Sequence, residues 1–176
     1  MFDQLLIAFK ARFTVSEISG AEPKLRFITV PKDQAVNAIR FLLEEHGYKH
    51  LVLLTAVDYL EQGKFQLTYL LHHPENQTDI GVCVLIDREH ATMESAHELW
   101  PTMATYQREL REMFGIGFPG SPGVDDDFIL EGWQGMPPYR RDFDTKVFAE
   151  SFYPQREGRE TNDPATYMKE KLYPNE

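Results

Sequence analysis

Residues 99–118 read LWPTMATYQRELREMFGIGF and join a short amphipathic helix to a glycine-bracketed turn. Within this stretch the apolar side chains recur at the spacing i, i+4, i+7 and i+8, which forms one stripe along a helix. The stripe consists of Tyr106, Leu110, Met113 and Phe114. Gly115 follows at the position where a helix commonly ends on a left-handed residue. The stretch therefore predicts a helix over residues 105–114 that is stopped by a glycine turn.

The other face of this predicted helix is strongly polar. It carries Gln107, Arg108, Glu109, Arg111 and Glu112. Because Arg108 and Glu112 are spaced i, i+4, they can pair across one turn. Taken alone, the pattern is typical of a solvated helix face with local ion pairs, which add little stability.

Outward from this helix, the hydrophobic periodicity predicts further helices and about five strands. Helices are predicted at residues 2–12, 33–46 and 94–100, and strands at 14–19, 25–30, 50–56, 65–72 and 80–86. The strand at 65–72 alternates apolar and polar side chains, which is typical of a half-buried strand. The order of elements predicts an α+β domain with a mixed or antiparallel sheet covered by helices.

The chain changes character after this domain. Residues 115–176 contain seven of the eleven prolines and seven of the eleven glycines, together with many aromatic residues that follow no period. A solvated linker would carry few aromatic side chains. We therefore predict a core domain over residues 1–116 and an extended arm over 117–176 that contacts partner subunits, with a short helix at 164–172. The alternative is an arm that wraps its own domain.

Composition excludes several classes of function. A net charge of −10 leaves no basic stripe for nucleic acid and no polybasic grip on an anionic membrane. The apolar runs are too short to span a bilayer. The single cysteine, Cys83, can neither form an internal disulfide nor hold an iron–sulfur cluster alone. The first residues lack the basic region of a secretory signal, so we expect a cytoplasmic protein.

Candidate metal and nucleotide sites are weak. His46 and His50 are four residues apart, but Gly47 breaks the helix between them. Residues 125–127 are three aspartates without the alternating spacing of a calcium loop, which favours a solvated or arginine-paired run. The glycines of residues 115–120 follow a helix and not a strand, so they fail the context of a phosphate loop. We expect no catalytic, cofactor-binding or metal-binding residue in this chain.

Three ordered blocks of the chain resemble a known family. The blocks are Leu54–Tyr59, Leu99–Ile116 and Tyr139–Phe143. They resemble the C-type subunit of the proton-pumping NADH-quinone oxidoreductase (complex I), and its counterpart in membrane-bound group 4 nickel–iron hydrogenases and in sulfur-reducing complexes. The middle block follows the family pattern of a Glu-Arg-Glu-type triplet, an acid and then Met-Phe-Gly-Ile. The resemblance spans roughly residues 1–145.

The chain departs from this family pattern in one place. Where the family has a histidine and a basic pair after its glycine turn, residues 120–130 read GSPGVDDDFIL, with Ser121 and three aspartates. The departure favours a hydrogenase-like or sulfur-reducing relative over a standard NADH-quinone enzyme.

The resemblance implies a cofactor-free structural or assembly subunit of a membrane-bound, ion-pumping oxidoreductase, held peripherally on the cytoplasmic side of the membrane. It implies a large catalytic subunit and a small iron–sulfur subunit as partners. These hold the iron–sulfur clusters and, according to the branch, a nickel–iron centre, flavin or quinone. Two alternatives stay open: a stand-alone metal-dependent hydrolase that uses Asp125–Asp127, and a soluble adaptor protein.

The same resemblance implies where the partner interface lies. The predicted interface residues are Arg108, Glu109, Glu112, Phe114, Trp133, Arg140, Arg141 and Asp142. Charged residues on the helix and in the arm lack an obvious local partner in the sequence, and desolvated arginine–carboxylate pairs fix the register between subunits.

Overall fold

The structure is a computed structural model that describes residues 2–20, 24–152 and 171. It divides into two compact units, Met1–Phe143 and Asp144–Glu176, and each is considered by itself. The first unit extends well past the expected boundary at residue 116, so residues 117–143 belong with the core by their contacts. The helix expected at 164–172 lies outside the described residues, apart from Lys171.

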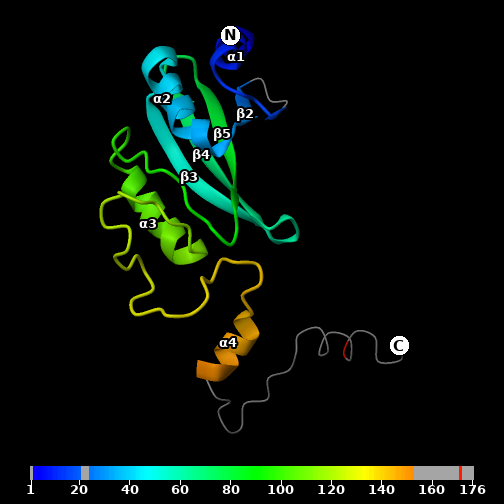
Figure 1. The fold of residues 1–176 in the computed structure, drawn as a ribbon, viewed down its shortest axis with the longest axis vertical. Helices are drawn as coiled ribbons and strands as arrows, with labels where there is room; N and C mark the ends of the chain where they lie inside the picture. The colour runs from blue at the N-terminus through cyan, green and yellow to red at the C-terminus, as the bar shows by residue number, and fades with distance from the viewer. Residues whose placement is uncertain (1, 21–23, 153–170, 172–176) are drawn as a thin grey trace. The chain divides into compact units, whose positions relative to one another are not determined.

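A five-stranded mixed sheet forms the centre of the first unit (Figure 1), which confirms the predicted α+β fold. Its order is β1-β2-β5-β4-β3, and only β2 and β5 pair in parallel among the described strands. The strands are β1 (Glu17–Ser19), β2 (Leu25–Thr29), β3 (His50–Tyr59), β4 (Lys64–His73) and β5 (Thr78–Asp87). The three long strands run on past their predicted ends because the pairing in the sheet supplies bonds that local propensity does not.

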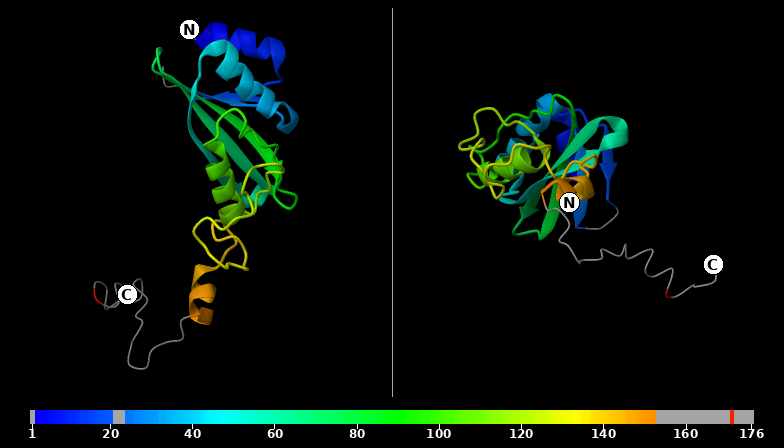
Figure 2. Two further views of the ribbon diagram at one scale, coloured as in Figure 1. Left: turned by 90° about the vertical axis from the view of Figure 1, so that its left-hand side faces the viewer. Right: turned by 90° about the horizontal axis from the view of Figure 1, so that it is seen from below.

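One face of the sheet packs against helices. The helices of the first unit are α1 (Phe2–Arg12), α2 (Ala35–His46) and α3 (Met103–Phe114), with short 3-10 turns η1 (Lys32–Gln34) and η2 (Leu60–Gln62). Alternate residues of β4 and β5 point into the core and are at most 2 % exposed: Phe65, Leu67, Tyr69, Leu71, Ile80, Val82, Val84 and Ile86. Figure 2 shows the twisted sheet from two further directions, with α3 beside the long strands.

The helix predicted at residues 94–100 is wrong. The stretch forms turns, in which Leu99 N–H donates to Ala96 O at 3.0 Å and the Trp100 indole N–H donates to Lys49 O at 2.9 Å. Two features of the sequence oppose a helix here. Pro101 disfavours the helical conformation of the residue before it, and the Ser95 hydroxyl bonds the N–H of His97 (3.4 Å) in competition with helical pairing.

The second unit contains a helix that the periodicity did not reveal, α4 (Thr145–Phe152). Its first turn is capped by the Asp144 carboxylate, which accepts the N–H groups of Lys146 and Val147 at 2.9 Å each. An aspartate in this position is among the strongest helix start signals. The expected arm is therefore not irregular throughout.

Candidate interaction face

Helix α3 presents much less solvated surface than its sequence suggests. Gln107 is fully buried, and its side-chain oxygen accepts a hydrogen bond from the Ser95 hydroxyl at 2.7 Å. The turns of residues 91–100 provide this cover. Within the apolar stripe, the Tyr106 hydroxyl donates to Val52 O at 3.0 Å and so joins the helix to the edge strand β3. The interpretation of this face as simply solvated is therefore corrected.

Glu112 organises the loop that follows the helix. Its carboxylate accepts the backbone N–H groups of Phe128 (2.7 Å), Ile129 (3.0 Å) and Leu130 (3.1 Å). Burial raises the pKa of this carboxyl, but these three N–H groups and the nearby Arg108 outweigh burial and leave the pKa lowered. Glu112 is thus a charged anchor for residues 128–130.

The predicted ion pair between Arg108 and Glu112 is replaced by a different contact. The Arg108 guanidinium lies over the ring of Phe128, with its central carbon 5.5 Å from the ring centre. Such a contact stabilises a cation on an aromatic face. Both residues thus hold the segment 128–130. Arg108 contacts the side chain of Phe128, and Glu112 binds the backbone N–H groups of all three residues.

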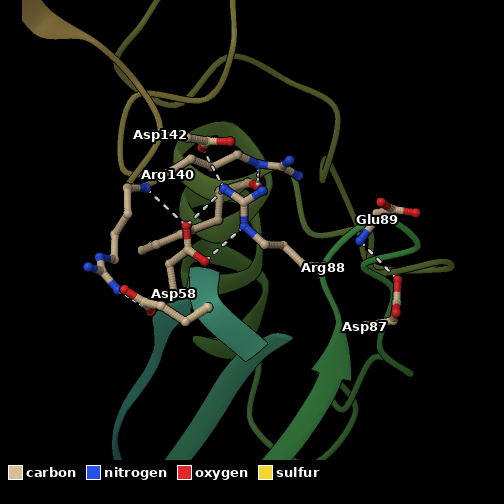
Figure 3. Close-up of polar contacts among 9 residues, drawn as sticks. Asp58, Asp87, Arg88, Glu89, Arg140 and Asp142 are labelled. Carbon is tan, nitrogen blue, oxygen red and sulfur yellow. Dashed lines mark hydrogen bonds and ion pairs between the residues drawn. The ribbon is translucent and has the colours of Figure 1, made fainter. Parts of the chain in front are cut away.

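A buried ion network joins the ends of β3 and β5 to residues 141–142 of the arm (Figure 3). The Asp58 side chain is 1 % exposed and receives Arg88 at both oxygens, at 2.9 and 3.1 Å. Figure 3 shows the Arg88 guanidinium between Asp58 and Asp142, and the second contact measures 2.5 Å. The hydrogen bonds that Arg88 donates to Asp58, and then to Asp142, raise the pKa of Arg88, and the bond from Arg88 lowers the pKa of Asp142.

The two arginines of the third sequence block also bind other parts of this chain. Arg140 Nε donates to Phe114 O at 2.8 Å, where the last carbonyls of α3 favour a cation. The backbone N–H of Arg141 donates to Asp58 at 2.9 Å, while its guanidinium pairs with the exposed Glu61 at 2.7 Å. Residues 139–142 are therefore fastened to the end of α3 and to the sheet.

Gly115 makes the close approach of arm and helix possible. It ends α3 at φ +77°, and a Cβ there would stand 3.1 Å from Pro137 Cγ and 3.2 Å from Arg140 Nη2. We expect Gly115→Ala to lower the free energy of unfolding by roughly 1–2 kcal/mol from the left-handed backbone alone, and by more from the crowding. Gly120→Ala is the control, since φ is +81° there but nothing lies within 4 Å. Chemical denaturation of both variants measures the difference, and equal losses would exclude the crowding.

The predicted interface residues lie on α3 and in the arm, and several of them contact other residues of this chain. Phe114 packs edge-on against Phe65 and Tyr139, with ring centres 5.8 and 5.7 Å apart. Trp133 donates its indole N–H to Met136 O at 3.1 Å. Glu109 lies half-buried on α3. Whether this surface meets a partner subunit stays a prediction.

Sequence reasoning missed Asp58, Arg88 and Gln107. Asp58 carried a signal, because an acid inside the apolar run of a buried strand needs a cationic partner. Arg88 follows the next strand but one in sequence, and only the register of the sheet brings the two strand ends together. Gln107 gave no signal, since its burial depends on the turns of residues 91–100.

The aspartate run does not assemble a metal site. Asp125 pairs with Arg111 at 3.1 Å, and Asp127 accepts the N–H of Gly132 at 3.3 Å. Among the residues that the structure describes, no three His, Cys, Asp or Glu side chains are grouped to hold a metal ion. The metal-dependent alternative thus lacks a metal cluster within the described chain.

No described helix has the length and apolar character that crossing a bilayer requires.

Comparisons with known proteins show which family this chain resembles. Residues 28–149 match the family model of the respiratory-chain NADH dehydrogenase 30 Kd subunit. The chain is 34 % identical over 116 residues to the C subunit of the NADH-quinone oxidoreductase of Moorella thermoacetica, covering 66 % of this chain and 78 % of that protein. It is 31 % identical over 138 residues to the C subunit of the same enzyme from Novosphingobium aromaticivorans, covering 78 % of this chain but only 44 % of that longer protein.

A solved structure has the same fold. It is a chain of the membrane-bound sulfane sulfur reductase, an archaeal respiratory membrane complex, with a TM-score of 0.81 and 24 % identity over 92 % of this chain and 96 % of that one. The family model covers well over half of the sequence, including all three blocks that define the helix, the buried network and the arm. The chain belongs to the family of the respiratory-chain NADH dehydrogenase 30 Kd subunit.

Proposed function

We propose that this chain is a cofactor-free structural subunit of a membrane-bound, ion-pumping complex I-like oxidoreductase. It lies in the peripheral arm on the cytoplasmic side of the membrane and braces the large catalytic subunit beside the small iron–sulfur subunit. The complex is of the hydrogenase, sulfur-reducing or NADH-quinone type. Both named relatives are subunits of NADH-quinone oxidoreductases, and the solved relative comes from a sulfur reductase complex.

The observation that carries this proposal is a group of exposed apolar side chains on the stretch 117–143, whose backbone is tied to the rest of the domain. The Asp58 network, Arg140 and Glu112 tie this irregular stretch down at three separate points. Nevertheless it exposes large apolar side chains: Ile129 (67 %), Tyr139 (58 %) and Met136 (45 %). A surface that is fixed in advance loses little conformational entropy on binding, and exposed apolar groups on it are typical of a protein contact.

Co-purification tests the proposed function. A tagged chain, recovered from gently solubilised membranes of its own organism, should bring down a large hydrogenase-like subunit and a small iron–sulfur subunit in equal amounts. Recovery of the chain as a free monomer would overturn the proposal. Recovery with partners that contain no iron, nickel or flavin would instead support the soluble adaptor.

A charge reversal tests the position of the interface. The predicted contact pairs Glu109 with a cationic group of the partner, and a lysine in its place would repel that group. We therefore expect Glu109→Lys on α3 to reduce recovery of the complex by about tenfold or more. The melting temperature of the isolated chain should change little. Glu75→Lys, in the exposed turn between β4 and β5 at the other end of the sheet, is the matched control. Equal recovery of both variants would remove α3 from the interface.

A further inference from the structure

The loop behind α3 carries a concentrated negative charge, of which the ion pairs among the described residues neutralise one carboxylate. Residues 124–135 include Asp125, Asp126, Asp127 and Glu131 and contain no lysine or arginine. Among the described residues, Arg111 forms an ion pair with this stretch, at Asp125, and Arg108 lies over the ring of Phe128. All four acids are exposed. The loop therefore attracts a cationic partner.

A cavity opens between this loop and the end of α3. Its volume is about 340 Å³, and its walls include Leu130, Trp133 and Pro137. Arg111 also lines it, in its ion pair with Asp125, and leaves Asp126 and Asp127 on the lining outside that pair. An aromatic and apolar wall beside two carboxylates suits a side chain that is both flat and charged.

The cavity is held in shape before any partner arrives. Glu112 fixes the backbone of residues 128–130, and the N–H of Trp133 donates to Leu130 O at 3.0 Å. The Trp133 indole is held in turn by Met136 O. Because these bonds are already made, binding need not order the loop, and little of the contact energy is lost to that ordering.

We propose that this cavity receives an arginine side chain from a basic segment of a neighbouring subunit. The guanidinium stacks on the Trp133 indole and pairs with Asp126 and Asp127, while the exposed Ile129 packs against apolar atoms of the same segment. Arginine fits better than lysine because its planar group stacks on aromatic rings and pairs with carboxylates through two parallel bonds. The identity of the neighbour as another subunit rests on the proposed function; the chemistry of the cavity does not.

The isolated chain tests the chemistry of the cavity directly. In ¹⁵N NMR titrations, N-acetyl-arginine amide should shift the indole signal of Trp133 and leave that of Trp100 in place. N-acetyl-lysine amide should shift it less, and N-acetyl-glutamine amide should have no effect. The double variant Asp126→Asn, Asp127→Asn should abolish the arginine shift. No response to the arginine probe, or equal responses to all three, would overturn the proposal.

The intact complex tests the role of the cavity in assembly. The same double variant should dissociate from its partners at lower salt than the wild type, with about tenfold weaker retention at low ionic strength. Asp33→Asn combined with Glu75→Asn removes two exposed charges elsewhere and should dissociate like the wild type. If the wild type assembles and the cavity variant is retained equally at every salt concentration, the inference fails while the proposed function stands. If the wild type does not assemble, the proposed function fails, and the NMR titration alone decides the inference.

Discussion

Replacing Asp58 with alanine is expected to destabilise the isolated chain by roughly 3–5 kcal/mol, the range seen when one partner of a buried ion pair is removed. Its side chain is 1 % exposed, and Arg88, which it holds through both oxygens, is only 12 % exposed. The variant leaves this guanidinium poorly solvated, with Asp142 as its remaining anion. It also frees the backbone N–H of Arg141. Urea unfolding of the two proteins measures the loss.

Glu61→Ala is the matched control for this prediction. Glu61 also binds the arm, through Arg141, but both side chains are more than half exposed and water replaces the contact. We expect little change in stability from this variant. If Asp58→Ala proves as mild as Glu61→Ala, the network of Figure 3 does not brace the arm.

Replacing Glu112 with alanine is expected to cost roughly 1.5–3 kcal/mol, because three backbone N–H groups lose a charged acceptor. The amide protons of Phe128, Ile129 and Leu130 should exchange with solvent much faster, which hydrogen–deuterium exchange detects. Glu109→Ala, one turn earlier on α3, should leave these amides protected. Unchanged protection in Glu112→Ala would show that the loop is ordered by other contacts.

The stabilisation from Glu112 should also depend on pH. Its pKa in the folded chain lies below the ordinary value of 4.5 for a glutamate. A carboxyl with a lowered folded pKa stabilises the fold fully above its unfolded pKa, and the contribution is lost as the pH falls through the folded value. The stability gap between wild type and Glu112→Gln should therefore be largest near neutral pH and shrink below about pH 4.5. A gap that is constant down to pH 3 would contradict this assignment.

The parts of the fold that follow from local periodicity could be predicted from the sequence. Strands β4 and β5 show a regular alternation, and Gly115 ends α3 as its position indicates. The turns of residues 91–100 and the burial of Gln107 could not be predicted, because side-chain bonds between distant segments override local preference. Helix α4 could have been found from its Asp144 cap, which periodicity alone does not weigh.

The predicted interface residues stay a prediction, and their arrangement could not be derived from the sequence. The family resemblance implied that Glu112, Arg140 and Asp142 belong to one surface. The register of β3, β4 and β5 brings Asp58 and Arg88 together, and Asp142 pairs with Arg88 at that end of the sheet. Charges that looked free in the sequence are therefore used to fix the arm, and the stretch that they hold in place is the surface that we propose for a partner.

Hydroxyl-radical footprinting tests the central claim, that residues 117–143 form the contact of this chain with its complex, most directly. The chain is oxidised alone and within the purified complex, and mass spectrometry compares the rates at single residues. We predict that Trp133, Met136 and Tyr139 become strongly protected in the complex, whereas the exposed Leu85 of β5 keeps its reactivity. Unchanged rates at the three arm residues, with protection at Leu85 in their place, would contradict the account.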